Sequence, residues 1–203
     1  MGVLALGCLA LPLGAAEDGG QAAAWTKLAL GARSAALGQA VTALENDPDA
    51  VLLNPALAAT QQQAHVGSQA AYLADGQQLH YLGFTRLFWP DSRFSWSLAY
   101  AQFVVSDPLE RRRGNTNAPD SFIRESASQF QAGVGGWLLD QRVAVGVSIR
   151  LISQALGDAS SEGYSGDGGL YWRALPNLGF AVVLRDLANR LAWSSDLTES
   201  IPP

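Results

Sequence analysis

The feature that most constrains the fold is an alternation of large apolar residues with small or polar ones, which begins near Ala64 and recurs along most of the chain. It is clearest from Arg142 to Leu151. There the odd positions are all Val, Ile or Leu, and the even positions between them are Ala144, Gly146, Ser148 and Arg150. Successive side chains of a β-strand point to opposite faces, so this period of two predicts strands with one bulky apolar face. We therefore expect an all-β fold of antiparallel strands.

Seven segments follow this pattern closely enough to be predicted as strands. They lie at 64–74, 77–88, 93–105, 126–139, 142–155, 162–174 and 177–190. Several reach ten residues, and a tilted strand of about ten residues crosses a bilayer. The connections at 89–92, 140–141 and 175–176 are short, whereas 106–124 is long and 155–161 is intermediate. Short turns at one end and longer loops at the other are typical of an outer-membrane barrel, and only the short connection at 75–76 departs from this scheme.

A secreted β-sandwich is the soluble alternative, since its strands also alternate with one face buried. The outer faces of a sandwich should carry many Lys, Glu and Thr. Here charged residues are only 15 % of the chain, and the non-apolar faces are Gly, Ala and Ser with single arginines. Aromatic residues gather near the predicted strand ends, at Phe88, Trp89, Trp137, Trp172 and Trp193. The pattern favours a transmembrane barrel over the sandwich.

Other functional classes lack their sequence signals. The net charge is −5 and, apart from Arg111 to Arg113, the basic residues are scattered, which argues against nucleic-acid binding. Cys8 is the only cysteine, so no disulfide framework and no cysteine metal site are expected. His65 and His80 lie in separate predicted strands without a third ligand at metal spacing. No nucleophile motif or phosphate loop is present, so we predict neither an enzyme nor a cofactor.

The first residues have the pattern of a secretory leader. Residues 3–16 are apolar and end in small residues before Glu17, which predicts cleavage near Ala16. No Lys or Arg precedes the apolar run, as a signal peptide normally requires, so Met1 is an internal start in one interpretation. A lipoprotein acylated at Cys8 is the poorer alternative, because apolar residues continue past that cysteine.

Between the leader and the strands lies an Ala-rich, turn-rich segment. We predict a short helix at about 34–44 with Ser34 as its N-cap, because Gly31 interrupts what precedes it. Turns are predicted at 46–49 and at Asn54-Pro55, since proline disfavours helical geometry in the residue before it.

The order of motifs in this segment is the most diagnostic part of the sequence. The motifs are Gly31-Ala32-Arg33, Leu37-Gly38, Glu45-Asn46-Asp47 and Asn54-Pro55-Ala56. They resemble the N-terminal signature of the PorV/PorQ family, a branch of the FadL-like outer-membrane barrels. Two positions depart from the family pattern: Leu37 stands where Met is usual, and Asn46 separates two acidic residues that are normally adjacent. The segments 167–173, 178–180 and 184–187 are also similar to the middle strands of the family.

The resemblance implies a barrel of roughly fourteen strands, with the N-terminal segment as a plug inside the lumen. It assigns to the plug motif Gly31, Arg33, Gly38, Asn54, Pro55 and Ala56, which would hold the plug in register or, as the less favoured alternative, contact a ligand. It also implies that Arg33 pairs with Glu45, Asp47 or Asp49, because a buried arginine needs such a partner. The inward positions Arg150, Asp167, Arg173, Arg185 and Asp186 would line the lumen or form a salt-bridge network that stiffens the wall.

Physical chemistry also predicts that strands are missing. A sheet in lipid has to close, and single-chain bacterial barrels have even strand numbers, whereas seven strands are predicted here. The final Pro202-Pro203 cannot form a closing strand, because proline lacks the amide donor. We therefore expect a signal peptide at 1–16, a plug at 17–60 and part of a larger barrel at 61–203.

Two non-catalytic functions follow as expectations. The resemblance implies a bacterial outer-membrane barrel that serves a protein-secretion system, in which the barrel binds a partner protein. The alternative is a FadL-like channel for uptake of hydrophobic small molecules. Both place the chain in outer-membrane lipid, and neither the cargo nor the ligand is indicated by the sequence.

Overall fold

The computed structural model describes residues 23–106, 109–111, 121–194 and 198–199. The predicted leader at 1–16 with Cys8, the loop residues Arg112 and Arg113, and the final prolines lie outside these residues. Among the described residues, no helix has both the length and the hydropathy of a membrane-spanning helix.

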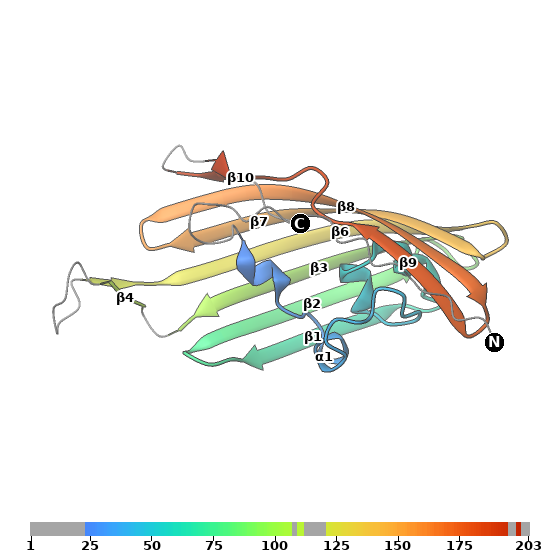
Figure 1. The fold of residues 1–203 in the computed structure, drawn as a ribbon, viewed down its shortest axis with the longest axis horizontal. Helices are drawn as coiled ribbons and strands as arrows, with labels where there is room; N and C mark the ends of the chain where they lie inside the picture. The colour runs from blue at the N-terminus through green and yellow to red at the C-terminus, as the bar shows by residue number, and fades with distance from the viewer. Residues whose placement is uncertain (1–22, 107–108, 112–120, 195–197, 200–203) are drawn as a thin grey trace, which may run out of the picture.

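The described chain forms one antiparallel sheet that curls into a half-barrel, with neighbouring strands mostly consecutive in sequence (Figure 1). Its strands are β1 (His65–Tyr72), β2 (Gln77–Leu87), β3 (Phe94–Val105), β6 (Glu125–Leu138), β7 (Val143–Leu156), β8 (Ala159–Leu175), β9 (Leu178–Leu184), β10 (Arg190–Trp193) and β11 (Thr198–Glu199). A separate small hairpin consists of β4 (Leu109–Arg111) and β5 (Ser121–Ile123). The predicted antiparallel β-sheet is thus confirmed.

All seven predicted strands are present, as β1, β2, β3, β6, β7, β8 and β9. Four short strands were not predicted. The predicted strand at 177–190 is wrong in its second half, because β9 ends at Leu184 and β10 begins only at Arg190. Both pair with β8: Leu184 lies opposite Gly168, and Arg190 lies opposite Tyr164. Residues 185–189 therefore face only residues 165–167, which makes a bulge in this strand.

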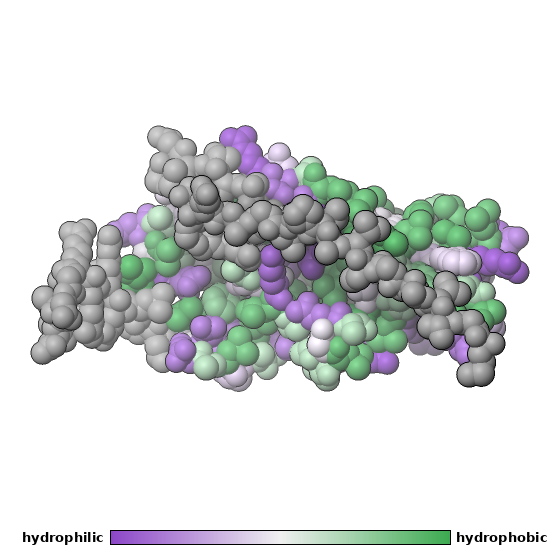
Figure 2. Space-filling model, viewed as in Figure 1, coloured by the Kyte–Doolittle hydropathy of each residue, from purple (hydrophilic) through white to green (hydrophobic). Residues whose placement is uncertain are grey.

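The two faces of the sheet differ as the alternation predicted. On β7 the apolar side chains of Val147 and Ile149 are 60 % and 52 % exposed on the convex face, whereas Ala144 and Arg150 on the concave face are 0 % and 2 % exposed. The exposed apolar surface continues along β8 and β9. In the view of Figure 2, hydrophobic residues are visible at the upper right margin of the molecule. The bulky apolar face of β7, β8 and β9 therefore points away from the rest of the described molecule, whereas Leu79 of β2 and Phe103 of β3 are buried on the concave side.

The concave face is covered by the chain that precedes β1, drawn from blue to teal in Figure 1. This N-terminal segment, residues 23–60, contains η1 (Ala24–Lys27), α1 (Ala32–Ala36), η2 (Ala50–Leu52) and η3 (Pro55–Thr60). The predicted helix at 34–44 is wrong. α1 has only five residues, Gly31 is its N-cap, and Ser34 lies inside it. Gly38 and Gln39 have φ angles of +59° and +64°, a left-handed geometry that ends the helix despite its alanines.

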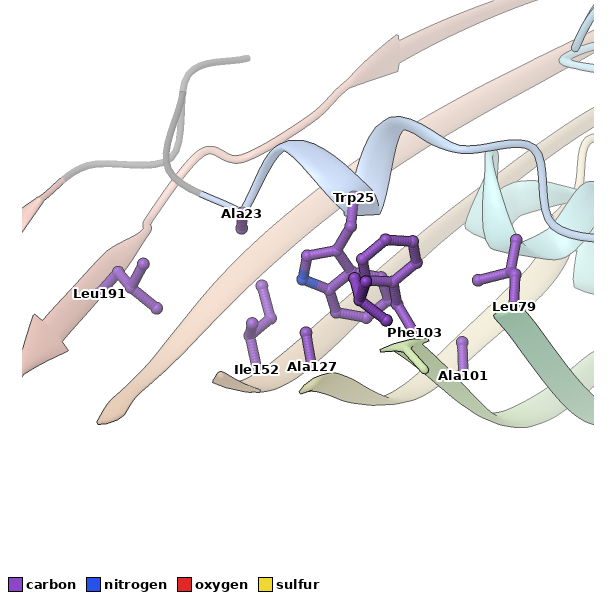
Figure 3. Close-up of a cluster of buried hydrophobic side chains, with 9 residues drawn as sticks. Ala23, Trp25, Leu79, Ala101, Phe103, Ala127, Ile152 and Leu191 are labelled. Atoms are coloured by element: carbon purple, nitrogen blue, oxygen red, sulfur yellow. The ribbon is translucent and has the colours of Figure 1, made fainter. Parts of the chain in front are cut away.

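Apolar side chains join the segment to the sheet in separate clusters. In the first, Trp25 of η1 stacks on Phe103 of β3 with ring centroids 6.4 Å apart, beside Ile152 and Leu191 (Figure 3). In the second, Val41, Val51 and residues 56–59 pack on Trp137, Ala144 and Tyr171. The core of the described molecule therefore lies between the segment and the concave face.

Candidate functional site on the concave face

A row of three glycines forms the floor on which the N-terminal segment lies. Gly135, Gly146 and Gly169 are direct register neighbours on β6, β7 and β8. A Cβ atom added to any of them would lie less than 3.0 Å from Asn54 or Pro55. No side chain larger than hydrogen therefore fits under the Asn54-Pro55-Ala56 turn, and the backbone of the turn packs directly on the backbone of the sheet.

Asn54 fixes the shape of this turn. Its backbone is extended, with φ −138°, as expected for a residue before proline. Its Oδ1 atom accepts a hydrogen bond from the amide of Ala56 at 3.0 Å, and its Nδ2 atom donates one to the carbonyl of Thr42 at 2.9 Å. Asn54 is fully buried, so the two hydrogen bonds offset the desolvation of its amide. The motif is thus the N-cap of η3 and the centre of the buried interface.

On the β8 side of this turn, Glu45 binds the wall through an arginine and a tyrosine. Arg173 donates from Nε and Nη2 to the two oxygens of Glu45, at 2.6 and 2.7 Å, and the Tyr171 hydroxyl donates to the same carboxylate. The guanidinium also stacks 4.6 Å above the ring of Trp137. Burial alone would raise the pKa of Glu45, but the hydrogen bonds from Arg173 and Tyr171 outweigh it and hold that pKa below its usual value.

On the β1–β2 side, Asp49 meets a second tyrosine without an arginine. Its carboxylate lies against Gly31 and Gly67, where a Cβ atom would clash with it, and the Tyr81 hydroxyl lies on the same side of Gly67. Burial, and then the neighbouring charge of Asp47, raise the pKa of Asp49, while the Tyr81 hydroxyl opposes this shift.

Arg33 is bound to the other member of this acidic pair. Its Nη1 atom lies 3.2 Å from Oδ2 of Asp47, and its side chain is 58 % exposed, so it is not the buried arginine that the resemblance implied. Gly31 has a φ of +89° and lies against Asp49, whereas Gly38 serves the turn after α1 and has open space where a Cβ would be.

The concave wall itself contains a buried network of charges at the bulge. Arg150 donates from Nη2 to Asp167 at 2.9 Å, to Asp186 at 2.7 Å and to the hydroxyl of Ser165 at 3.3 Å. The amide of Asp186 donates to Asp167 at 3.0 Å. Asp186 reaches this position because the bulge gives its backbone a φ of +56°, which is uncommon for residues other than glycine.

The predicted inward residues therefore separate into three environments. Arg150, Asp167 and Asp186 form the network at the bulge, Arg173 binds Glu45 of the segment, and Arg185 takes part in neither. The glycine row and the two tyrosines were missed. Their signal is visible only after the strands are aligned, because the three glycines become neighbours in the sheet register and not in the sequence.

The described residues give no sign of a metal centre or a known relative. His65 and His80 lie on β1 and β2, and no group of three or more His, Cys, Asp or Glu in the described ranges is placed to hold a metal ion. No family model, curated protein or solved structure matches this chain.

Proposed function

We propose that residues 61–203 form part of the wall of a bacterial outer-membrane β-barrel and that residues 17–60 belong to its plug. The barrel would be of PorV/PorQ type, without catalytic activity, and would serve protein secretion by binding a partner protein. The main observation in favour of a barrel wall is the exposed apolar surface of the convex face. The packing of the N-terminal segment on the concave face supports its assignment as a plug.

The outward side chains change from apolar to polar at the same register on four adjacent strands. One row of neighbours consists of Tyr100, Phe130, Leu151 and Tyr164, each between 43 % and 52 % exposed. The next outward row consists of Gln102, Ser128, Ser153 and Glu162. An ordered boundary of this kind is expected where a lipid-facing band ends, with aromatic rings at its margin.

The length of the apolar band also fits a membrane. On β7 the outward apolar positions run from Val143 to Leu151, which spans about 27 Å along the strand. At a strand tilt of about 40°, this corresponds to about 21 Å along the membrane normal, close to the ~25 Å apolar band of outer-membrane barrels. A water-soluble protein rarely exposes a continuous apolar surface of this extent.

The plug assignment is supported by what the segment touches. Ala56, Leu57 and Ala58 are completely buried, and η3 contacts β6, β7 and β8 on the concave face. Two carboxyl side chains of the segment, Glu45 and Asp49, lie beside tyrosines of the wall. These contacts are those expected of a plug docked inside a barrel.

Fractionation of cells that express the protein with its natural leader tests the membrane assignment. The protein should sediment with the outer membrane, resist extraction with carbonate and need detergent for purification. Recovery from the periplasm without detergent would disprove the assignment and favour the secreted sandwich.

A FadL-like channel for hydrophobic small molecules is the second candidate. The observation in its favour is a small cavity between segment and wall that is apolar on the segment side. The segment contributes Leu28, Leu30, Leu52 and Leu53, whereas the wall contributes the polar residues Gln129, Gln131, Arg150 and Arg185. Saturable uptake of a hydrophobic compound that is lost on deletion of residues 31–57 would favour the channel. Loss of surface-exported proteins without any change in uptake would favour the secretion role.

A further inference from the structure

Arg185 is an arginine of the concave wall that takes no part in the network of Arg150, Asp167 and Asp186. It is the first residue of the bulge between β9 and β10, and its side chain is partly buried. Its Nε atom is buried and has no hydrogen-bond partner in the described part of the chain. A buried guanidinium donor without an acceptor is costly, because it has lost its water without gaining a replacement.

The nearest carboxylates do not fill this need. Asp167 and Asp186 are close enough to influence Arg185, but both are directly bound to Arg150, at 2.9 and 2.7 Å. Arg150 is itself close enough to repel Arg185. Both carboxylates therefore pair with Arg150, and the guanidinium of Arg185 has no ion-pair partner within the described residues.

A cavity adjoins this guanidinium. It has a volume of about 300 Å³ and is lined by Thr26, Lys27, Gln39, Arg185 and Asp186. Two of these side chains are held in place by the segment itself: Thr26 donates to the carbonyl of Ala23 at 2.8 Å, and Gln39 donates to the carbonyl of Lys27 at 2.9 Å. The lining thus combines two cationic side chains with polar groups, and its single carboxylate is turned to Arg150.

We infer that this cavity binds a small hydrophilic oxyanion, a carboxylate or a phosphate, with the guanidinium of Arg185 as the principal donor. A planar guanidinium offers paired N–H groups to such an anion, and these charge-assisted hydrogen bonds are about twice as strong as neutral ones. A metal cation would meet the charges of Arg185 and Lys27, and an apolar ligand would desolvate them. The site depends on the docked segment and the bulge, and does not depend on the proposed membrane role.

Chemical modification of the whole protein tests the site without a mutation. Phenylglyoxal modifies arginine side chains, and mass spectrometry measures its rate at each residue separately. At least one of the two anions, inorganic phosphate or acetate, added in turn at a saturating concentration, should slow the modification of Arg185 at least about fivefold. The exposed Arg190, five residues further along the chain, should be unaffected and serves as the internal control. Protection by only one of the two anions would identify the class of ligand.

Variants give the second readout. Binding of the protecting anion, followed by titration calorimetry of the detergent-purified chain, should weaken about tenfold or more in Arg185→Gln, because a charge-assisted contact is lost. Arg185→Lys should keep part of the affinity, and Arg190→Gln should keep all of it. Equal phenylglyoxal rates at Arg185 with and without both anions, or an unchanged affinity in Arg185→Gln, would overturn the inference.

Discussion

On each side of the N-terminal segment a carboxyl side chain lies beside a tyrosine of the wall, but the electrostatic surroundings of the two contacts are opposite. At the β8 end, Glu45 meets Tyr171 and is neutralised by Arg173. At the β1–β2 end, Asp49 lies beside Tyr81, but the neighbouring charge that acts on it is the carboxylate of Asp47. One contact therefore favours the ionised carboxylate and the other disfavours it, as the lowered pKa of Glu45 and the raised pKa of Asp49 indicate.

The glycine row lies between these two contacts. It explains why the segment can dock although the contact of Asp49 is the less favourable of the two. The Asn54-Pro55-Ala56 turn is completely buried on Gly135, Gly146 and Gly169, and contributes through close packing and satisfied hydrogen bonds. Neither of these depends on ionisation. We therefore expect the uncharged centre to contribute most of the docking free energy, and the charged contacts to contribute a smaller, pH-dependent part.

The largest effect is expected from filling the glycine floor. Gly146→Val should displace the turn, because its side chain would overlap the backbone of Pro55 and Ala56, with a cost of about 3 kcal/mol or more. Tryptic cleavage at Lys27 and Arg33, followed by mass spectrometry, should become faster as the segment detaches. Gly166→Ala is the matched control, since its Cβ would lie 3.8 Å from its nearest neighbour. If Gly146→Val leaves the rate of tryptic cleavage unchanged, the turn does not pack on the three glycines as described.

The second largest effect is expected from breaking the ion pair between Glu45 and Arg173. Arg173→Gln should destabilise the docked segment by roughly 1–3 kcal/mol, because it leaves the Glu45 carboxylate partly buried beside Tyr171 without its cation. The same proteolysis assay measures the change. Arg142→Gln, at an exposed arginine near the start of β7, is the control. If both variants behave alike, the Glu45 contact does not hold the segment.

The other anchor should respond with the opposite sign. Asp49→Asn keeps the shape of the side chain and an acceptor for the Tyr81 hydroxyl, but removes the burial of a charge beside Asp47. The docked segment should become more stable by about 0.5–1 kcal/mol at neutral pH, because the desolvation penalty disappears. Glu45→Gln should destabilise it in the same assay. Two changes of the same sign would show that the two anchors are equivalent.

The sequence predicted the long strands well, because their apolar residues repeat at a period set by the β-strand itself. Val143 to Leu151 alternate without a break, and β7 is found where they predicted it. The bulge at 185–189 could not be predicted in this way. Its geometry follows from the register between β8 and its two partners, β9 and β10, and from the ion pair between Arg150 and Asp186.

The candidate site, too, was predictable where the structure depends on neighbouring residues in the sequence and unpredictable where it depends on distant ones. The Asn54-Pro55 turn was predictable, because proline acts on its immediate neighbour. The helix at 34–44 was not, since helix propensity is a weak signal and the left-handed backbone at Gly38 and Gln39 overrides it. The partners Glu45 and Arg173 are 128 residues apart, and no local pattern links them.

The smallest effect is a pH dependence that differs between the two anchors. A raised pKa means that docking favours protonated Asp49, so this contact gains stability as the pH falls and loses it as the pH rises through that pKa. A lowered pKa means that the Glu45 contact is fully present above the usual value of 4.5 and is lost only as the pH falls through the lower, folded value. As the pH falls from neutral toward 4.5, hydrogen exchange corrected for its intrinsic rate should therefore slow around residues 47–52 and stay constant around 43–46. Asp49→Asn should abolish this difference, and its persistence in that variant would show that Asp49 is not the titrating group.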